Sequence, residues 1–387
     1  MKPFLEVDRA GTYSVKHEEV KKLFGSSDVI PMWVADMDIA APEIIAKAIQ
    51  KRALHPIYGY TIYPKEYFRS IALWMKKRYD MTIQESWIVP ASGVVTSINL
   101  AIEAYTNLND AIIVQTPIYP PFISSVKNHK RKLLENRLLY ANGKYHIDFE
   151  DFENKAKEAK LFLLSSPHNP TGRVWSKEEL VNLMEICKKY GVLVVSDEIH
   201  ADLVYGKSNI SFASLGYDRC IVLNAPSKTF NIAGLKTSYV IIPDKKLRVI
   251  YETVQKNAGL ESGNPFGIEA LIASYNEGDV WLGELKSHLK SNIDLIKNSL
   301  KANQIPIKPI EAEATFLMWL DCQELYGKQE HITDFFYKEA KLGLSDGKLF
   351  GNGGEGFMRL NFGTSSMVIS LAMKQLNEAY IRTHNVF

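Results

Sequence analysis

The sequence predicts an α/β protein whose large domain contains a parallel β-sheet and whose smaller domain mixes helices and strands. Two observations support this: short apolar, β-branched segments alternate with helical segments up to about residue 275, and strands become sparser after it. Strands that are apolar on both faces and separated by helices are typical of a parallel sheet covered by helices on both sides. We therefore expect a large domain at 41–275, a small domain at 276–387, and a segment 1–40 that packs against the small domain.

The elements of the large domain follow from local residue patterns. A helix is predicted after Ser176, because Ser176 and Glu179 form a capping box and Gly191 supplies the stop. Helical spacing predicts two further helices, at 42–54 and 66–79. Short apolar segments predict strands at 111–117, 159–167, 191–198, 220–226 and 238–243.

The elements of the small domain are less regular. A long helix is expected at 280–303, a second helix near 331–340 and a final helix at 366–383. Apolar segments at 314–321 and 357–363 predict strands between them.

The composition excludes several classes of function. Hydrophobic residues make up 46% and charged residues 23% of the chain, as in ordinary globular proteins. The formal net charge of +2 comes without a basic stripe, so we expect no nucleic-acid partner. No apolar run is long enough to span a bilayer, the N-terminus lacks a signal-peptide core, and the scattered Cys187, Cys220 and Cys322 are typical of reduced thiols. We expect a cytoplasmic protein with no membrane partner and no metal site.

Polar residues directly follow five apolar segments. In an open parallel sheet, ligands bind at the carboxyl ends of the strands, so these residues are expected to meet at one edge of the sheet. They are Ser92-Gly93, Tyr119, His168-Asn169, Asp197 with His200, and Ser227-Lys228.

Three of these residues suggest a specific chemistry, although each has a common alternative. Lys228 follows an apolar strand, where desolvation lowers the pKa of an amine and favours imine formation with an aldehyde; most lysines are instead solvated. Asp197 ends a strand too apolar for an unpaired charge, so it needs a cation such as a protonated pyridine nitrogen, or it caps a helix. Asn169 could donate to a phenolate oxygen or belong to a turn between prolines.

The motifs SPHNPTG, SDEIH and APSKTFNIAGLK, in this order, resemble the class I/II aminotransferase superfamily, which comprises fold type I pyridoxal-phosphate enzymes. Asn169 precedes Asp197 by 28 residues, and Asp197 precedes Lys228 by 31. The resemblance extends from PMWVADMD near the start of the chain to MRLNFG near its end. It implies a mostly parallel seven-stranded sheet between helices, and pyridoxal 5′-phosphate as the cofactor.

The resemblance implies roles around the cofactor ring. Lys228 would bind the cofactor as a Schiff base and then move protons. Asp197 would pair with the pyridine nitrogen, and Asn169 would contact the phenolic oxygen, with His200 close by. Tyr119 would stack on the ring face, unless it is a core aromatic residue.

Further roles concern the phosphate. Gly93, Val94 and Val95 would begin a helix whose free N–H groups bind it, and the Ser227 hydroxyl would join them. Lys236, eight residues after Lys228, stands where most transaminases of this class have a phosphate-binding arginine. A lysine has the positive charge of an arginine but lacks the two parallel N–H donors of a guanidinium, so the role of Lys236 in phosphate binding is left open.

The resemblance also implies a substrate site and a dimer. Arg359 in MRLNFG is the expected bidentate clamp for the substrate α-carboxylate, with Asn169 and Ala35 beside the same group. Tyr60 in YGYT would reach the cofactor phosphate of the neighbouring subunit, which implies a homodimer with shared active sites. Tyr60 or Tyr119 could also influence proton transfer to the leaving group.

Within the superfamily, PMWVADMD (31–38), YGYT (58–61) and SKTFNIAGL (227–235) resemble bacterial carbon–sulfur lyases of the cystathionine β-lyase (MalY/PatB) type. Lys236 in place of arginine, and no second arginine motif for a dicarboxylate, point the same way. The resemblance implies cleavage of cystathionine or cysteine-type substrates to a thiol, pyruvate and ammonia. The alternatives are an aminotransferase of broad specificity and a non-catalytic, cofactor-binding regulator.

Overall fold

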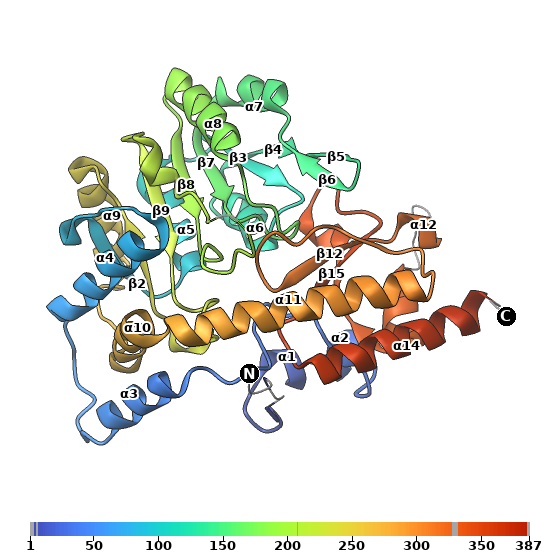
Figure 1. The fold of residues 1–387 in the computed structure, drawn as a ribbon. Helices are drawn as coiled ribbons and strands as arrows, with labels where there is room; N and C mark the ends of the chain where they lie inside the picture. The colour runs from blue at the N-terminus through green and yellow to red at the C-terminus, as the bar shows by residue number, and fades with distance from the viewer. Residues whose placement is uncertain (1–3, 5–6, 207, 327–331, 385–387) are drawn as a thin grey trace.

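A seven-stranded sheet forms the centre of the larger part of the molecule (Figure 1). The computed structural model describes the whole chain except residues 1–3, 5–6, 207, 327–331 and 385–387. In spatial order the strands are β2 (Ile88–Ala91), β10 (Ser238–Ile241), β9 (Cys220–Asn224), β8 (Leu193–Asp197), β7 (Ala159–Ser165), β3 (Ala111–Thr116) and β4 (Lys132–Arg137). The α/β class and the mostly parallel seven-stranded sheet are confirmed.

One strand runs against the others. β10 is antiparallel to both β2 and β9, whereas β9, β8, β7, β3 and β4 pair in parallel. Two parallel strands need a long crossover connection between them, usually a helix. Residues 225–237, which connect β9 to β10, contain no helix longer than a single short turn. The expectation of a parallel strand at 238–243 is therefore wrong in direction, and the edge strand β4 was not predicted.

Helices cover both faces of the sheet, as the doubly apolar strands require. α5 (Val94–Tyr105), α6 (Pro120–Asn128) and α9 (Lys245–Asn257) share one core with alternate strand residues such as Ile112 and Val114. The opposite face packs against other helices through residues such as Ile113. These helices are α4 (Lys65–Tyr79), α7 (Phe149–Ala156), α8 (Lys177–Tyr190) and α10 (Pro265–Glu277).

The capping box predicted for α8 is present. The Ser176 side chain accepts from the Glu179 backbone N–H, the Glu179 side chain accepts from Ser176, and Gly191 ends the helix in the left-handed conformation.

The C-terminal part contains a smaller antiparallel sheet. Its strands, in spatial order, are β11 (Lys308–Pro309), β12 (Leu317–Asp321), β15 (Phe357–Asn361) and β14 (Ser345–Asp346). The long helices α11 (Asp279–Ala302) and α14 (Ser366–His384) pack against each other beside it (Figure 1). The predicted helix at 331–340 is a short turn, α13 (Ile332–Asp334), followed by a π-helical turn at Phe335–Glu339; residue 331 lies outside the described residues.

The N-terminal segment contacts this C-terminal part. It contains α1 (Val15–Glu18), α2 (Val20–Phe24) and β1 (Ile30–Pro31), and β1 pairs in parallel with β13 (Leu342–Gly343). The domain limits at 40 and 275 stay a prediction.

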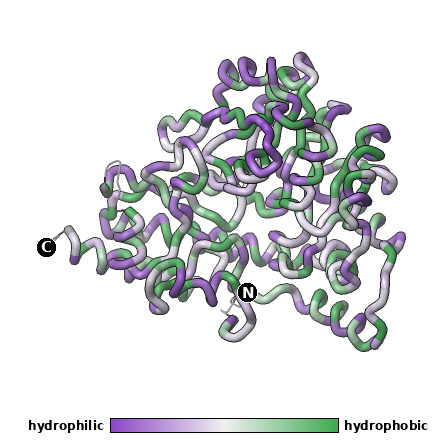
Figure 2. The backbone as a smooth tube through the Cα atoms, turned by 180° about the vertical axis from the view of Figure 1, so that it is seen from behind, coloured by the Kyte–Doolittle hydropathy of each residue, from purple (hydrophilic) through white to green (hydrophobic). Residues whose placement is uncertain are grey.

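The helix α3 (Glu43–Ala53) packs on α10, and the connection from α3 to α4 runs along the outer edge of the molecule in both opposite views (Figures 1 and 2). Several large apolar side chains of this connection are exposed. Residues 54–62 of this connection are called the arm below.

No helix in the described part of the chain combines the length and apolarity needed to cross a bilayer. The cysteines Cys187, Cys220 and Cys322 are buried and unpaired, as predicted for reduced thiols.

Candidate active site

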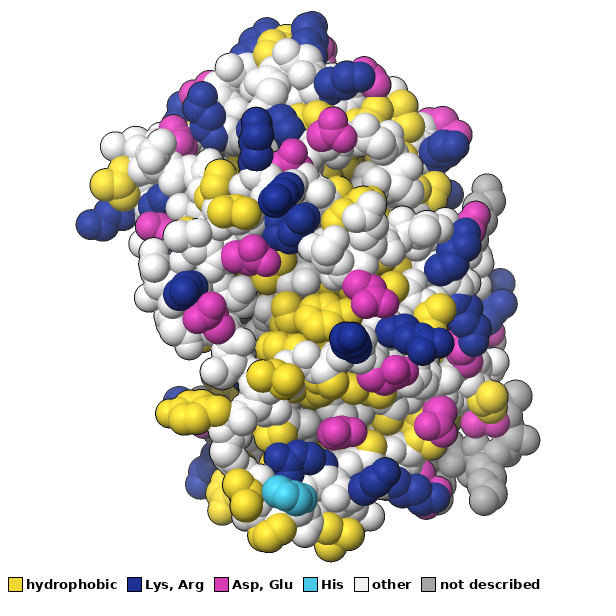
Figure 3. Space-filling model, turned by 90° about the vertical axis from the view of Figure 1, so that its left-hand side faces the viewer, with side chains coloured by type: hydrophobic (Ala, Val, Ile, Leu, Met, Phe, Trp, Pro, Cys, Tyr) yellow, Lys and Arg dark blue, Asp and Glu magenta, His cyan; other side chains and the backbone are white. Residues whose placement is uncertain are grey.

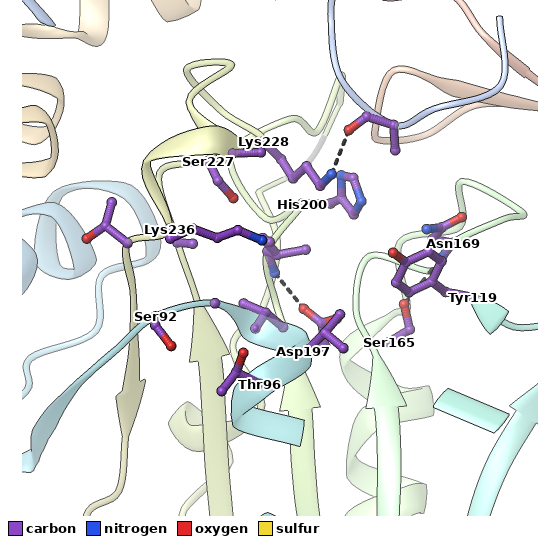
Figure 4. Close-up of a pocket in the computed structure, with 18 of the residues that line it drawn as sticks. Ser92, Thr96, Tyr119, Ser165, Asn169, Asp197, His200, Ser227, Lys228 and Lys236 are labelled. Atoms are coloured by element: carbon purple, nitrogen blue, oxygen red, sulfur yellow. Dashed lines mark hydrogen bonds between the residues drawn. The ribbon is translucent and has the colours of Figure 1, made fainter. Parts of the chain in front are cut away.

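A cavity of about 220 Å³ lies at the carboxyl ends of the central strands (Figure 4). The strand register brings these ends together, since Ser165 lies opposite Asp197, and Asp197 opposite Leu223. The cavity is lined by eleven of the predicted site residues: Ala35, Gly93, Val94, Val95, Tyr119, Asn169, Asp197, His200, Ser227, Lys228 and Lys236.

Lys228 extends into the cavity from the loop after β9. Its Nζ donates to the Ala35 carbonyl at 2.6 Å (Figure 4). Burial lowers the pKa of Lys228 to about 8, against the opposing effect of the Asp36 carboxylate. Roughly a tenth of the amine is therefore neutral and nucleophilic at pH 7, far more than for a solvated lysine.

Asp197 is the last residue of β8 and is buried. Its Oδ1 accepts from the Ile199 N–H at 3.1 Å, and it makes no ion pair within the described residues. Burial raises the pKa of Asp197 to about 7. No helix begins at this point, so the helix-capping alternative is wrong. The charge of Lys228 acts on this carboxylate without forming an ion pair with it, so a bound cationic group would supply a direct partner.

The start of α5 also lines the cavity and has the donors that an anion needs. Gly93 precedes the helix with φ of 155°, and no side chain caps the first turn, so its N–H groups are free to bind a ligand. Hydroxyls of Ser92, Thr96 and Ser227 surround this end, and Lys236 reaches toward it (Figure 4). Together these donors suit a phosphate.

Arg359 lies beside the cavity rather than in its wall. From β15 its Nη1 donates to Asn169 Oδ1 at 3.0 Å and its Nη2 to the Trp33 carbonyl at 2.9 Å, while the guanidinium lies 4.9 Å from the Phe350 ring centre. Its buried Nε has no hydrogen-bond partner among the described residues. Burial lowers the pKa of Arg359 to about 10, so it stays charged at neutral pH.

Two aromatic rings complete the site. His200 is buried, and desolvation together with the nearby charges of Lys228 and Arg359 lowers its pKa well below the usual value, so its ring is neutral. Tyr119 is tied to the neighbouring loop, since its N–H donates to the Asn169 carbonyl at 3.1 Å. Burial raises the pKa of Tyr119, which keeps its hydroxyl protonated.

His168 does not belong to the site, although it follows β7. It is fully buried with Nδ1 2.8 Å from Thr171 Oγ1, and Nε2 3.3 Å from the Gln115 carbonyl. Its expected place on the rim is therefore wrong, because the turn after β7 directs this ring into the protein.

Tyr60 does not line the cavity of its own chain. Its side chain, on the arm, is fully exposed at 104%. Its role in a neighbouring subunit stays a prediction.

The chain matches a known family over most of its length. Residues 28–376 match the family model for aminotransferase class I and II. The chain belongs to this family. It is 40% identical to cystathionine beta-lyase PatB of Bacillus subtilis over 378 residues, which cover 96% of this chain and 98% of that protein.

Solved structures of other family members share the fold. The structure of cystalysin from Treponema denticola, which contains pyridoxal 5′-phosphate, covers 99% of both chains with a TM-score of 0.94 and 34% identity. A pyridoxal-phosphate-bound C–S lyase from Staphylococcus hominis covers 98% of both chains with a TM-score of 0.91 and 32% identity.

The side chains and backbone groups that line the cavity fit pyridoxal 5′-phosphate, the cofactor that these two solved structures contain. The Lys228 amine suits an aldehyde, the unpaired Asp197 a protonated ring nitrogen, and the uncapped start of α5 a phosphate. Thr96, Ser165 and Thr237 also line the cavity and were not predicted. A hydroxyl in the first turn after a glycine is the signal that could have identified Thr96. No group of three or more His, Cys, Asp or Glu in the described residues could hold a metal ion.

Proposed function

We propose that this protein is a pyridoxal-phosphate-dependent carbon–sulfur β-lyase acting on cystathionine or cysteine-type amino acids. The observation that carries the cofactor assignment is the meeting of a Lys228 amine of lowered pKa and an unpaired Asp197 in one cavity. The identity of 40% with a cystathionine beta-lyase over nearly the whole chain supports the lyase reaction.

The side chains have distinct tasks in this reaction. When bound, pyridoxal phosphate supplies an aldehyde that links covalently to amines and a ring that withdraws electrons from the substrate Cα. Arg359 and Asn169 hold the substrate carboxylate and orient the Cα–H bond toward Lys228. The neutral Nζ of Lys228 then accepts the Cα proton, while neutral His200 adds no competing positive charge beside it.

The breaking bond joins Cβ to sulfur. Its electron pair leaves with the sulfur as a thiolate, which takes up a proton. Tyr119, protonated and at the cavity wall, is one proposed donor, and the partner's tyrosine at position 60 is another. With cystathionine and water, the balanced products are homocysteine, pyruvate and ammonia.

The deciding experiment supplies the purified, cofactor-loaded protein with cystathionine and no keto acid. We expect continuous release of pyruvate and of a free thiol in equal amounts. Turnover that stops after one equivalent per site, and resumes on adding 2-oxoglutarate without thiol release, would contradict the lyase proposal.

That second outcome would favour an aminotransferase of broad specificity. The family model itself is that of aminotransferases, and the two reactions share their first proton transfer. Lys236 keeps a positive charge near the proposed phosphate site, so the position usually held by arginine does not by itself separate the two reactions.

We propose further that a second copy of this chain covers the arm. Leu54, Ile57, Tyr58, Tyr60 and Ile62 are between 57% and 104% exposed. On the face that carries α4 and α9, hydrophobic side chains also gather between charged ones (Figure 3). Exposed apolar groups this close together favour a protein–protein contact. In this dimer Tyr60 would lie at the neighbour's phosphate site.

Mixing two inactive variants tests the shared site. Lys228→Ala and Tyr60→Phe subunits, once exchanged into heterodimers, would rebuild one complete site per dimer if Tyr60 crosses over. We expect recovery of up to about half of wild-type activity per heterodimer. If both parent variants are impaired and verified heterodimers recover no activity, Tyr60 lies outside the neighbour's site.

A further inference from the structure

A short segment without regular secondary structure, residues 32–39, contributes Ala35 to the wall of the active-site cavity. Its Ala35 carbonyl accepts from Lys228 Nζ at 2.6 Å, and its Trp33 carbonyl accepts from Arg359 Nη2 at 2.9 Å. One stretch of backbone therefore contacts both the amine and the guanidinium assigned above to catalysis and substrate binding.

On its inner side this segment is held by two asparagines. Asn361 Nδ2 donates to the carbonyls of Val34 and Asp36. Asn231 accepts from the Met37 N–H at 3.0 Å and donates to the Met37 carbonyl at 2.8 Å. Side chains thus replace the backbone partners that a strand or helix would provide.

On its outer side the segment is held by ion pairs with the N-terminal part of the chain. Arg9 spans two carboxylates, with Nη2 2.7 Å from Asp36 Oδ2 and Nη1 2.9 Å from Asp38 Oδ1. Lys16 Nζ lies 2.5 Å from Asp38 Oδ2, and His17 Nε2 lies 3.2 Å from Asp38 Oδ1.

The inner part of this ionic cluster is buried, whereas the side chains of Arg9 and Asp36 are 20% and 22% exposed. Lys16 is 1% exposed and Asp38 6% exposed. Two carboxylates face the side chains of Arg9 and Lys16, so removing one member takes away one of the partners of the charges that remain. Since apolar residues can stabilise a buried site as well as ions do, the directional bonds of this cluster are better explained by a need for defined geometry.

We propose that Arg9 is a positioning residue of the active site: by clamping Asp36 and Asp38 from outside the cavity, it fixes the backbone wall whose carbonyls hold the catalytic amine and the guanidinium. This inference rests on the proposed role of Lys228. Arg9 itself does not line the cavity.

The clamp also bears on the charge of the amine. The charged groups that act on Lys228 are Asp36, Arg359 and Asp197, and the nearby His200 is neutral. Without Arg9, the Asp36 carboxylate would be less neutralised, and a looser wall would admit water to the amine. Both changes favour the ammonium form, so both raise the pKa of Lys228.

The test measures Lys228 directly in cofactor-free protein. Wild type and Arg9→Met are labelled with a trace of acetic anhydride across a pH series, and the peptide containing Lys228 is quantified by mass spectrometry. We expect the labelling midpoint of Arg9→Met to lie higher by about one pH unit. The matched control is Lys22→Met, which removes an exposed lysine of the same N-terminal segment, 2.7 Å from Glu19, and should leave the midpoint unchanged.

A second variant and a second readout guard against simple misfolding. Arg9→Lys keeps the positive charge but loses the guanidinium whose two Nη atoms contact both carboxylates. We therefore expect a smaller increase in the labelling midpoint of Lys228. In the cofactor-loaded enzyme, KM for cystathionine should rise several-fold in both variants, because the wall also holds the guanidinium of Arg359. If Arg9→Met does not fold, Arg9→Lys decides the question.

Wild-type midpoints in the folded variants would overturn the proposal. Because the labelling needs neither cofactor nor substrate, its result is separate from the proposed function. A wild-type protein in which borohydride fixes no cofactor to Lys228 would contradict the proposed function while leaving the Arg9 measurement intact.

Discussion

Two clusters of ionisable side chains are connected through the segment 32–39, which carries Asp36 and Asp38 and whose Ala35 carbonyl accepts from Lys228, yet they differ in whether the protein supplies their partners. In the N-terminal cluster, the carboxylates of Asp36 and Asp38 are paired with cations of the same chain. In the cavity, the carboxylate of Asp197 makes no ion pair within the described residues, and Lys228 donates only to a neutral carbonyl.

The two buried aspartates show the consequence. For Asp38, burial is outweighed by hydrogen bonds from His17 and Lys16, which hold its pKa well below the usual range. For Asp197, burial dominates and raises the pKa to about 7. Similar burial of the same residue type thus gives opposite results. Because Asp197 also lines the cavity, its unpaired carboxylate is a suitable partner for a ligand charge.

The largest effect is expected from Lys228→Ala, which removes the proposed covalent anchor and the base of the unpaired cluster. Turnover should fall by about 10⁴-fold or more. Borohydride should fix the cofactor to the peptide containing Lys228 in wild type and to no peptide in the variant. Labelling of another lysine in wild type would show that the amine of this cluster is misassigned.

A paired comparison of Asp38→Asn with Asp197→Asn tests the difference between the clusters. In cofactor-free protein at pH 8, Asp38→Asn should lower the free energy of unfolding by about 3–5 kcal/mol, because buried Lys16 loses its nearest partner and keeps only Asp36 at 4.0 Å. Asp197→Asn should raise it by about 1–4 kcal/mol, because a desolvated, unpaired charge disappears. Urea unfolding measures the change in the free energy of unfolding for both variants. Changes of the same sign would contradict the proposed difference between the paired and the unpaired aspartate.

The pH dependence of the two aspartates should also be opposite. The folded pKa of Asp197 exceeds the unfolded value of about 4, so its unfavourable contribution grows as pH rises from about 4 to 7. The folded pKa of Asp38 is depressed, so its stabilising contribution is present above about pH 4 and is lost as pH falls toward the folded value. The gain from Asp197→Asn should accordingly shrink between pH 8 and pH 5.

Arg359→Lys should have a smaller effect, confined to the substrate. Losing a charged hydrogen bond corresponds to roughly 1.5–3 kcal/mol, so KM should rise by about 10- to 100-fold. The cofactor absorbance and the unfolding midpoint serve as controls and should change little. Wild-type KM in this variant would mean that another residue binds the carboxylate.

The smallest effect is expected from Lys236→Ala, because this side chain is exposed and its charge is screened by salt. Cofactor affinity should fall by less than about tenfold, with a larger loss at low than at high ionic strength. Lys236→Arg keeps the charge and should retain the affinity. A salt-independent loss of affinity would point to a structural rather than an electrostatic role.

The sequence was sufficient for what depends on local pattern. Asp197 and Lys228 follow strands that are recognisable from a few apolar residues, and parallel strands bring such ends together. The ion pair between Arg9 and Asp36 joins residues 27 apart, and the short elements α1, α2 and β1 between them give no sequence pattern from which this distance could be predicted. Lys16, in VKHEE, has the sequence pattern of a solvated helix but is buried. The proposed role of Tyr60 involves a second chain, which no pattern within one chain can place.

Gly93 has a consequence for protein engineering. An added Cβ would meet nothing closer than Thr96 Oγ1 at 3.7 Å, so there is room for a methyl group. The φ of 155° is nevertheless one that residues with a side chain rarely adopt. A library screened only for steric fit would accept alanine here, although the peptide would have to rotate and re-aim the N–H groups at the start of α5. Backbone torsion, not free volume, should therefore decide which substitutions are tried at this position.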